Sequence, residues 1–416
     1  MTNVCFYSIL ADILIDEIMN KMSGSVNFSD TKSHYALLDG LRGVAALMVL
    51  WYHVFEGFAF AQGSIIETFN HGHLGVDFFF MLSGFVISYA YDDRWKKGKQ
   101  IKDNGRPSLS LGSFFKRRLI RLHPMLVMGA FIGLVAFLIQ GGVKWDGTET
   151  SFKWIMLAFV LTLFFIPAYP GAAYDIRGNG EMFPLNGPSW SLFFEYIGNI
   201  VYAIILRRFS TKMLGFLTCV LGVSWIWFVA FDISGYDMVG VGWTLDTINF
   251  CGGFLRMMFP FTLGMLMSRK FRQRTTDNKQ QSFFVRNIFW IATIVLFVLF
   301  SVPYLPKTTA VSVNGIYELI CIMIVFPVIV WLGASNTAIS PFTTKICTFL
   351  GNISYPLYIV HYPVMYVFYA WLINNKLYTL GETWQMVLLV MTVSIALAYL
   401  CLKLYDEPIR RKLGAR

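Results

Sequence analysis

The length and composition of the chain indicate a membrane protein. Of its 416 residues, 56% are hydrophobic and 14% are charged, and the mean hydropathy is +0.57. A water-soluble globule cannot bury so much apolar surface. At roughly 20 residues per crossing, this length accommodates about ten or eleven transmembrane helices. Little chain remains for anything else, so we expect no large appended catalytic domain.

The net charge of +10 would favour a nucleic-acid partner in a soluble chain. Here Lys and Arg are confined to a few hydrophilic segments between apolar runs, as in signals that orient membrane helices. We therefore interpret the positive charge as a signal that orients the membrane helices, and we predict no nucleic-acid partner. The six cysteines form no CxxC pair or disulfide framework, and we expect them to be packing residues.

Residues 1–33 form a mixed-polarity extension to which we assign no function. Its apolar stretch is broken by Asp12, Asp16 and Glu17 and lacks a basic start, so it is not typical of a secretory signal. Residues 34–416 are predicted to form one transmembrane domain.

Apolar runs of helical length occur throughout residues 34–416. They cover approximately 36–57, 74–91, 122–140, 152–168, 189–206, 213–231, 249–268, 283–302, 315–332, 353–373 and 383–404. Strongly basic connections lie at 92–121, 207–212 and 269–286 and after Lys403. The positive-inside rule places all of them in the cytoplasm.

Three apolar runs lie between the basic connections 92–121 and 207–212. Two connections on the same side require an even number of crossings, so one of the three runs does not span. The best candidate is 152–168, which is short and ends at Pro167 before a Gly/Pro-rich stretch. We therefore predict an all-α polytopic protein with about ten crossings, one re-entrant or interfacial segment on the outer side, and both termini in the cytoplasm.

Ionisable residues at membrane depth are costly unless they are paired or solvated, so each is a candidate functional residue. The first predicted helix carries Arg42 and His53, which are eleven residues apart. On a helix this spacing returns to within ~20° of the same face over a rise of ~16 Å, so the two side chains face one groove at two depths. The alternative is a snorkelling arginine and a satisfied core histidine.

Asp77 and Glu195 are predicted to reach a depth similar to that of His53 from two further helices. Such a cluster suits a general base whose imidazole is oriented by carboxylates. A structural ion-pair network is the alternative. Arg256 also lies within an apolar run and needs a partner that the sequence does not name.

Arg117, Arg118 and Arg121 lie at the cytoplasmic end of the third predicted crossing. Arg118 and Arg121 are three residues apart, so a helix presents both guanidinium groups on one face. This geometry suits a phosphorylated ligand. Anchoring of the topology by positive charge is the alternative.

The remaining histidines have weaker functional signals. His361 is predicted near the middle of the bilayer, where a satisfied interhelical contact is an alternative to an acid–base role. His71 and His73 flank a glycine, but further ligands are lacking and we predict no metal site. No P-loop, dinucleotide fingerprint or nucleophile elbow occurs in the sequence.

Taken together, these segments resemble the membrane-bound acyltransferase-3 family. The matching elements occur in the family's order over approximately residues 35–412. They are Leu38 to Gly43 with the Arg-x10-His spacing from Arg42 to His53, Gly75 to Gly84, Arg118-x-x-Arg121, Ser189-Trp190-Ser191-Leu192 leading to Glu195, Leu350-Gly351 to His361-x-Pro363, and Glu407-Pro408. No single element is specific, but the ordered set is. The chain has one carboxylate, Glu195, where the family frequently has an acidic pair, and we expect it not to carry the extracellular esterase-like domain of some members.

The resemblance implies transfer of a short acyl group, usually acetyl, from cytoplasmic acyl-coenzyme A to a hydroxyl of a carbohydrate or another metabolite. The donor would rest its phosphates on Arg117, Arg118 and Arg121, and its extended arm would run along the groove of Arg42. No metal cofactor is expected.

The mechanism we expect assigns His53 as general base for the acceptor hydroxyl, with Glu195 or Asp77 orienting its ring. Arg42 would hold the donor or stabilise negative charge on the carbonyl oxygen. Substrate-binding candidates are Ser189, Trp190 and His361. A covalent route through Ser189 or Ser191 stays open, although neither has an identifiable neighbouring base.

A proton-coupled transporter of a polar solute is the competing class, because intramembrane Arg, His and carboxylate groups would suit it equally. Turnover of acyl-coenzyme A separates the two classes. The expected partners are the donor, the hydroxyl acceptor and the lipid bilayer, and the expected location is the bacterial inner membrane. Homo-oligomerisation is left open.

Overall fold

The computed structural model describes residues 35–63, 70–95, 109–273, 287–307, 310–336 and 340–414, so the extension 1–33 lies outside the described residues. The described chain is helical, with isolated β-bridges and no strands. The α-helices are α2 (Ala36–Ala61), α3 (Gly75–Tyr91), α4 (Leu111–Ile139), α5 (Phe152–Leu163), α6 (Ser189–Ile204), α7 (Thr211–Ala230), α8 (Thr247–Arg272), α10 (Ile288–Ser301), α11 (Val313–Ile320), α12 (Phe326–Ser335), α13 (Pro341–Asn375), α14 (Leu380–Cys401) and α15 (Glu407–Gly414). Short π-helical stretches make α11 continuous with α12 and α14 continuous with α15.

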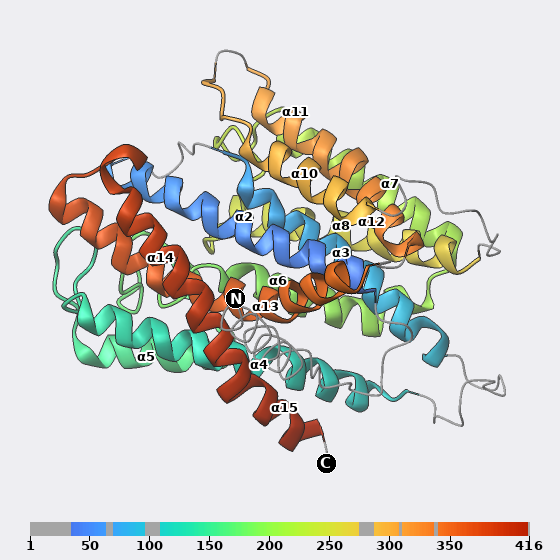
Figure 1. Cartoon of the computed structure of the whole chain (residues 1–416), viewed down its shortest axis with the longest axis horizontal. Coiled ribbons are helices and arrows are strands. Elements are labelled where there is room, and N and C mark those ends of the chain that lie inside the picture. The colour runs from blue at the N-terminus through green and yellow to red at the C-terminus, as the bar shows by residue number, and fades with distance from the viewer. Residues whose placement is uncertain are drawn as a thin grey trace, which may run out of the picture.

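The predicted class, an all-helical polytopic membrane protein, is confirmed. Within the described ranges, nine helical stretches are long and apolar enough to cross a membrane. Most long helices run in roughly the same direction, with α4 and α5 at one edge of the view and α7, α10 and α11 toward the opposite edge (Figure 1). Large apolar side chains such as Phe216, Val223 and Ile294 are exposed on the outside, as expected for lipid-facing positions.

Two apolar helices are shorter than the nine candidate spans. The 12 residues of α5 rise about 18 Å, and this is the segment for which the sequence predicted no crossing. The 14 residues of α10 rise about 21 Å, and the sequence counted this run as a crossing. The end of α10 meets a buried loop of the bundle, because the backbone N–H of His71 donates to the carbonyl of Phe300 at 3.0 Å.

The basic connections converge on one end of the bundle, which we call the basic end. There Asp92 accepts hydrogen bonds from Arg269 and Arg272, at 2.8 and 3.1 Å. The Tyr202 hydroxyl donates to the same carboxylate, and the ring of Phe114 packs against Tyr202. The start of α4 and the end of α6 therefore lie at the same end, as the parity of the predicted crossings requires.

The most extensive helix contact joins α2 and α13, which run in the same direction. A Cβ at Gly40 would meet Cys347, and a Cβ at Gly57 would meet Tyr369. Residues further along α2 therefore contact residues further along α13, as expected for parallel helices. Small residues allow such close backbone approach in membranes, where van der Waals packing and interhelical hydrogen bonds hold helices together. This contact places Arg42 and His53 of α2 beside α13.

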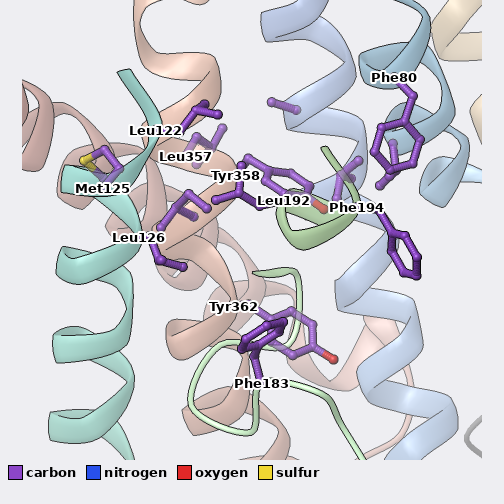
Figure 2. Packing of buried hydrophobic residues seen from close by; sticks show 14 of the residues in the cluster. Phe80, Leu122, Met125, Leu126, Phe183, Leu192, Phe194, Leu357, Tyr358 and Tyr362 are labelled. Carbon is purple, nitrogen blue, oxygen red and sulfur yellow. The ribbon is translucent and has the colours of Figure 1, made fainter. Parts of the chain in front are cut away.

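The apolar core fills the space between α13 and its other neighbours. Leu122, Met125 and Leu126 of α4 lie close to Leu357 and Tyr358 of α13 (Figure 2). All five are buried. Dense packing on both sides therefore fixes the position of α13 relative to α2 and α4.

The contact of α3 with α8 depends on glycine. A Cβ at Gly84 would overlap the carbonyl oxygen of Phe261, and one at Gly264 would overlap that of Met81. We expect Gly84→Val to lower the melting temperature and the yield of folded protein sharply, because overpacking at a backbone contact costs about 1–3 kcal/mol or more. Thermal unfolding of the protein in detergent measures this effect.

Gly215 of α7 provides the matched control. A Cβ there meets nothing within 4 Å. Gly215→Ala should preserve or slightly raise the melting temperature, because alanine favours helix over glycine. Equal melting temperatures for Gly84→Val and the wild type would contradict the close contact of α3 with α8.

Candidate active site

Two cavities meet inside the bundle. The arginine cavity is lined by Arg42, Arg118 and Arg121 among others. The histidine cavity is lined by His53 and aromatic side chains. Val76 and Tyr358 line both cavities, so the two spaces are separated by little more than these side chains.

His53 is oriented by a carboxylate of its own helix. Its Nδ1 lies 2.6 Å from Oε2 of Glu56, one helical turn further along α2. The hydroxyl of Tyr369 donates to the same oxygen at 2.9 Å and that of Tyr362 lies at 3.5 Å. When the Nδ1–H of neutral His53 donates to Glu56, its Nε2 carries the lone pair that a general base needs.

The structure does not bring Glu195 or Asp77 to His53, as the sequence had suggested. Glu195 lines the arginine cavity and accepts hydrogen bonds from Arg118 at 2.9 Å and from Ser83 at 2.9 Å. The prediction of depth assumed that α6 begins at the membrane surface. In fact the preceding loop dips into the bundle, where Asn186 donates to the carbonyl of Ile359, so α6 begins deep.

Asp77 forms a buried ion pair with Arg256, which gives this arginine the partner that the sequence could not name. The distance from Nη2 of Arg256 to Oδ2 of Asp77 is 2.8 Å, and both side chains are almost fully buried. Arg256 also donates to the carbonyls of Val241 and His73. The pair therefore holds two loops that form the wall of the histidine cavity, which is the structural alternative considered for Asp77.

Arg42 belongs to the arginine cavity and contacts α13. Its Nε donates to Oγ of Ser354 at 2.9 Å and its Nη2 to the carbonyl of Gly351 at 3.1 Å. Asp39 lies 3.0 Å from the same Nη2. Arg42 and His53 both lie on the side of α2 that packs against α13, but they line two different cavities rather than the single groove that the sequence predicted.

The three arginines of α4 are not equivalent. Arg118 and Arg121 line the arginine cavity, whereas Arg117 does not. Successive helical residues lie about 100° apart, so Arg117 and Arg118 lie on opposite sides of Arg121, and it is the side of Arg118 that faces the cavity. The predicted pair with a spacing of three residues is therefore present, and Arg117 is outside it.

The substrate-binding candidates also differ in whether they line a cavity. Trp190 lines the histidine cavity, while Ser189 is buried and lines neither cavity. Ser191 lines the arginine cavity and its hydroxyl lies 2.6 Å from that of Tyr358. His361 is buried behind the cavities, with its ring centroid 5.2 Å from that of His53.

His361 has one ring nitrogen committed to the backbone. Its Nδ1 lies 2.9 Å from the carbonyl oxygen of Leu357, so this nitrogen is the donor. Nε2 has no hydrogen-bond partner in the described part of the chain. His361 thus packs beside His53 as a neutral ring rather than lining the space where substrates would lie.

The pair His71 and His73 contacts Glu318 of α11. Nδ1 of His71 lies 2.8 Å and Nε2 of His73 lies 2.9 Å from the same carboxylate oxygen. The other oxygen accepts from the backbone N–H of Val239 at 2.6 Å. Burial of this carboxylate is thus compensated by three neighbouring groups, which tie α11 to the loops around the histidine cavity.

Sequence reasoning missed two carboxylates of the histidine cavity, Glu56 and Glu181. The spacing of His53 and Glu56 was a usable signal, because residues three apart are neighbours on a helix. Glu181 gives no periodic signal because it lies in the long loop between α5 and α6. Burial raises the pKa of Glu181 to about 7.

Comparison with known proteins is consistent with this architecture. The family described as "Acyltransferase domain" (Acyl_transf_3) matches residues 35–403. The chain belongs to this family and is an acyltransferase. The resemblance inferred from the sequence is therefore confirmed.

Two relatives illustrate the similarity. The chain is 34% identical over 175 residues to "Protein 2 in picA locus" of Rhizobium radiobacter, which covers 41% of the chain and 81% of that protein. It is 25% identical over 399 residues to peptidoglycan O-acetyltransferase OatA of Listeria monocytogenes, which covers 92% of the chain. The matched region is 56% of the length of the Listeria protein. No solved structure matches the chain.

The buried Asp77–Arg256 pair leads to a stability prediction. Asp77→Asn leaves the guanidinium of Arg256 buried without its counter-charge, which should cost about 3–5 kcal/mol. The double variant Asp77→Leu/Arg256→Met should recover part of this loss, because it removes both charges. Thermal unfolding in detergent compares these proteins.

Asp93→Asn is the control for removal of a carboxylate. Asp93 pairs with Arg272 but its side chain is 45% exposed, so solvent replaces the partner. Its melting temperature should stay close to that of the wild type. If Asp77→Asn unfolds no earlier than Asp93→Asn, the buried pair does not hold the cavity wall.

Proposed function

We propose that this protein is a membrane O-acetyltransferase that moves an acetyl group from acyl-coenzyme A to a hydroxyl of a carbohydrate. The observation that carries the proposal is the meeting of the arginine and histidine cavities at Val76 and Tyr358. One cavity offers cations for a phosphorylated donor, and the other offers a histidine with an orienting carboxylate. The name of the Listeria relative, a peptidoglycan O-acetyltransferase, supports O-acetyl transfer to a carbohydrate polymer.

The donor is proposed to bind from the basic end. Its phosphates lie against Arg118 and Arg121, since guanidinium groups form charge-assisted hydrogen bonds with phosphate. The pantetheine arm extends past Arg42 toward Val76 and Tyr358. This path ends at the wall shared with the histidine cavity, where the thioester meets the acceptor.

The proposed chemistry uses one proton and one leaving group. Nε2 of His53 accepts the proton of the acceptor hydroxyl while the hydroxyl oxygen forms a bond to the thioester carbon. The carbon–sulfur bond breaks, its electron pair goes to sulfur, and the imidazolium returns the proton to give the coenzyme A thiol. Glu56 acts as a positioning residue, because it holds the tautomer of His53 and stabilises the imidazolium.

The basic end is proposed to face the cytoplasm of a bacterial inner membrane, by the positive-inside rule. Both termini then lie in the cytoplasm, and the histidine cavity opens on the outer side. The transporter alternative is not proposed, because the family to which the chain belongs is one of acyltransferases.

The first test separates chemistry from donor binding. His53→Ala should abolish acetyl transfer, and Glu56→Gln should lower it by about 10²–10⁴-fold, the range of a general acid–base contribution. Both variants should keep the thermal stabilisation that coenzyme A gives to the purified protein. Transfer is measured as alkali-labile acetyl groups formed from radiolabelled acetyl-coenzyme A in membrane vesicles.

Tyr369→Phe serves as control for Glu56→Gln. It removes one hydrogen bond to Glu56, at 2.9 Å, without removing the carboxylate. A hydrogen bond to a charged group is worth about 1.5–3 kcal/mol, so transfer should fall by less than in Glu56→Gln. A fully active Glu56→Gln protein would exclude Glu56 as the residue that positions His53.

The second test concerns the donor site. Arg121→Gln should weaken the binding of coenzyme A by tenfold or more, because Arg121 lines the arginine cavity. Arg117→Gln, on the same helix, should bind within about twofold of the wild type, because Arg117 does not line the arginine cavity. Isothermal titration in nanodiscs measures both. Equal losses in the two variants would indicate a general charge effect and contradict the proposed donor site.

A further inference from the structure

Glu181 is a carboxyl group of the histidine cavity that the proposed reaction does not use. It lies in the loop between α5 and α6, and only 7% of its surface is exposed. Asn179, Gly187 and Pro188 of the same loop also line this cavity. A buried carboxyl group facing a ligand-sized space needs either a structural or a functional reason.

The backbone around Glu181 is rigidly held. Met182 donates its N–H to the carbonyl of Trp243 at 2.8 Å, and Glu181 forms a β-bridge with Thr244. The hydroxyl of Tyr366 in α13 donates to Oε2 of Glu181 and accepts the N–H of Gly187 at 3.1 Å. The carboxyl group is therefore pre-positioned on the side of the cavity formed by this loop.

The polar groups of the cavity favour a ligand that both donates and accepts hydrogen bonds: Nε1 of Trp145, a donor, is buried without a hydrogen-bond partner among the described residues. Glu56 and Glu181 contribute two carboxyl groups, and Oδ1 of Asn179 is buried with no hydrogen-bond partner in the described chain. The guanidinium of Arg256 is already engaged by Asp77 and by two backbone carbonyls. Hydroxyl groups match such a lining, whereas a carboxylate or phosphate on the ligand would be repelled by Glu56 and Glu181.

The charge state of Glu181 agrees with this geometry. Burial raises its pKa to about 7, and the nearby Glu56 carboxylate adds to the effect, while Tyr366 and Arg177 oppose it. Burial therefore disfavours the ionised form relative to an exposed glutamate. A hydroxyl that donates to the carboxylate would stabilise the ionised form and supply the hydrogen bond that water otherwise provides.

We propose that Glu181 binds a second hydroxyl of the acceptor while His53 takes the proton of the reacting hydroxyl, and that this cavity selects an uncharged, polyhydroxylated acceptor residue over an anionic one. The inference rests on the proposed function and adds to it the acceptor-binding residue and the charge class of the acceptor. The aromatic rings of Trp145, Trp190 and Trp243 line the same cavity and offer apolar faces to the carbon skeleton of such a residue.

Two variants distinguish acceptor binding from a structural role of Glu181. Glu181→Gln keeps an oxygen that accepts from Tyr366 but removes the carboxylate, whereas Tyr366→Phe removes the hydrogen bond but keeps the carboxyl group. Each is compared with wild type for alkali-labile acetyl groups formed in envelope vesicles from acetyl-coenzyme A. Coenzyme A stabilisation of the purified protein reports the donor site separately.

We expect Glu181→Gln to lower transfer at least tenfold with unchanged melting temperature and unchanged coenzyme A stabilisation, and Tyr366→Phe, which keeps the carboxylate but loses one hydrogen bond to it, to lower transfer by a smaller factor. Transfer by Glu181→Gln at the wild-type rate would overturn the assignment, and so would equal losses in both variants, which would indicate a structural role. Absence of any transfer by the wild type would instead overturn the proposed function.

The charge class is tested on the wild-type product. Mass spectrometry of the envelope glycans before and after mild alkali identifies the sugar residue that carries the acetyl group. An uncharged residue supports the inference. Acetylation of a uronic acid, or of a residue bearing phosphate, would overturn the selection while leaving O-acetyl transfer itself established.

Discussion

The parallel contact between α2 and α13 is the constraint on which the site depends. Gly40 and Gly57 let the two helices approach over most of their length, which places Arg42 against Ser354 and His53 beside Tyr362. Without this approach, the two polar residues of α2 would face apolar neighbours or lipid at considerable cost. The same contact brings Tyr369 to Glu56, so α13 supplies part of the environment that orients His53.

The fold could be predicted largely from the apolar runs and the basic connections, because these features report directly on membrane length and on charge asymmetry. The placement of Arg42 and His53 on one side of α2 also followed from helical geometry, although they line different cavities. The ion-pair partners of Glu195 and Asp77 could not be predicted from the sequence. Glu195 belongs with Arg118 and Asp77 with Arg256, because depth along α3 and α6 depends on where the preceding loops enter the bundle. Those loops have no periodicity from which their depth can be read.

The loops that enter the bundle also explain why polar residues of non-helical segments reach the candidate site. Glu181 and Asn179 line the same cavity as His53 although they belong to a Gly/Pro-rich connection. Irregular backbone at membrane depth is tolerated where it lines a cavity or is buried in protein. Here Trp243 and Tyr366 satisfy its backbone and side-chain groups, so the loop is part of the packed structure.

The thin wall between the two cavities relates the fold to the chemistry. A donor that carries phosphate groups needs cations, whereas a neutral histidine base functions better away from them, because a nearby positive charge disfavours protonation of the ring. Separate cavities meet both needs: Arg118 and Arg121 lie on one side of Val76 and Tyr358, and the His53–Glu56 pair lies on the other. In the proposed function, only the slender acyl-bearing arm of the donor passes between them. The helices that carry the wall, α3 and α13, are among the most tightly packed in the structure, so its position is fixed by close glycine contacts of both helices.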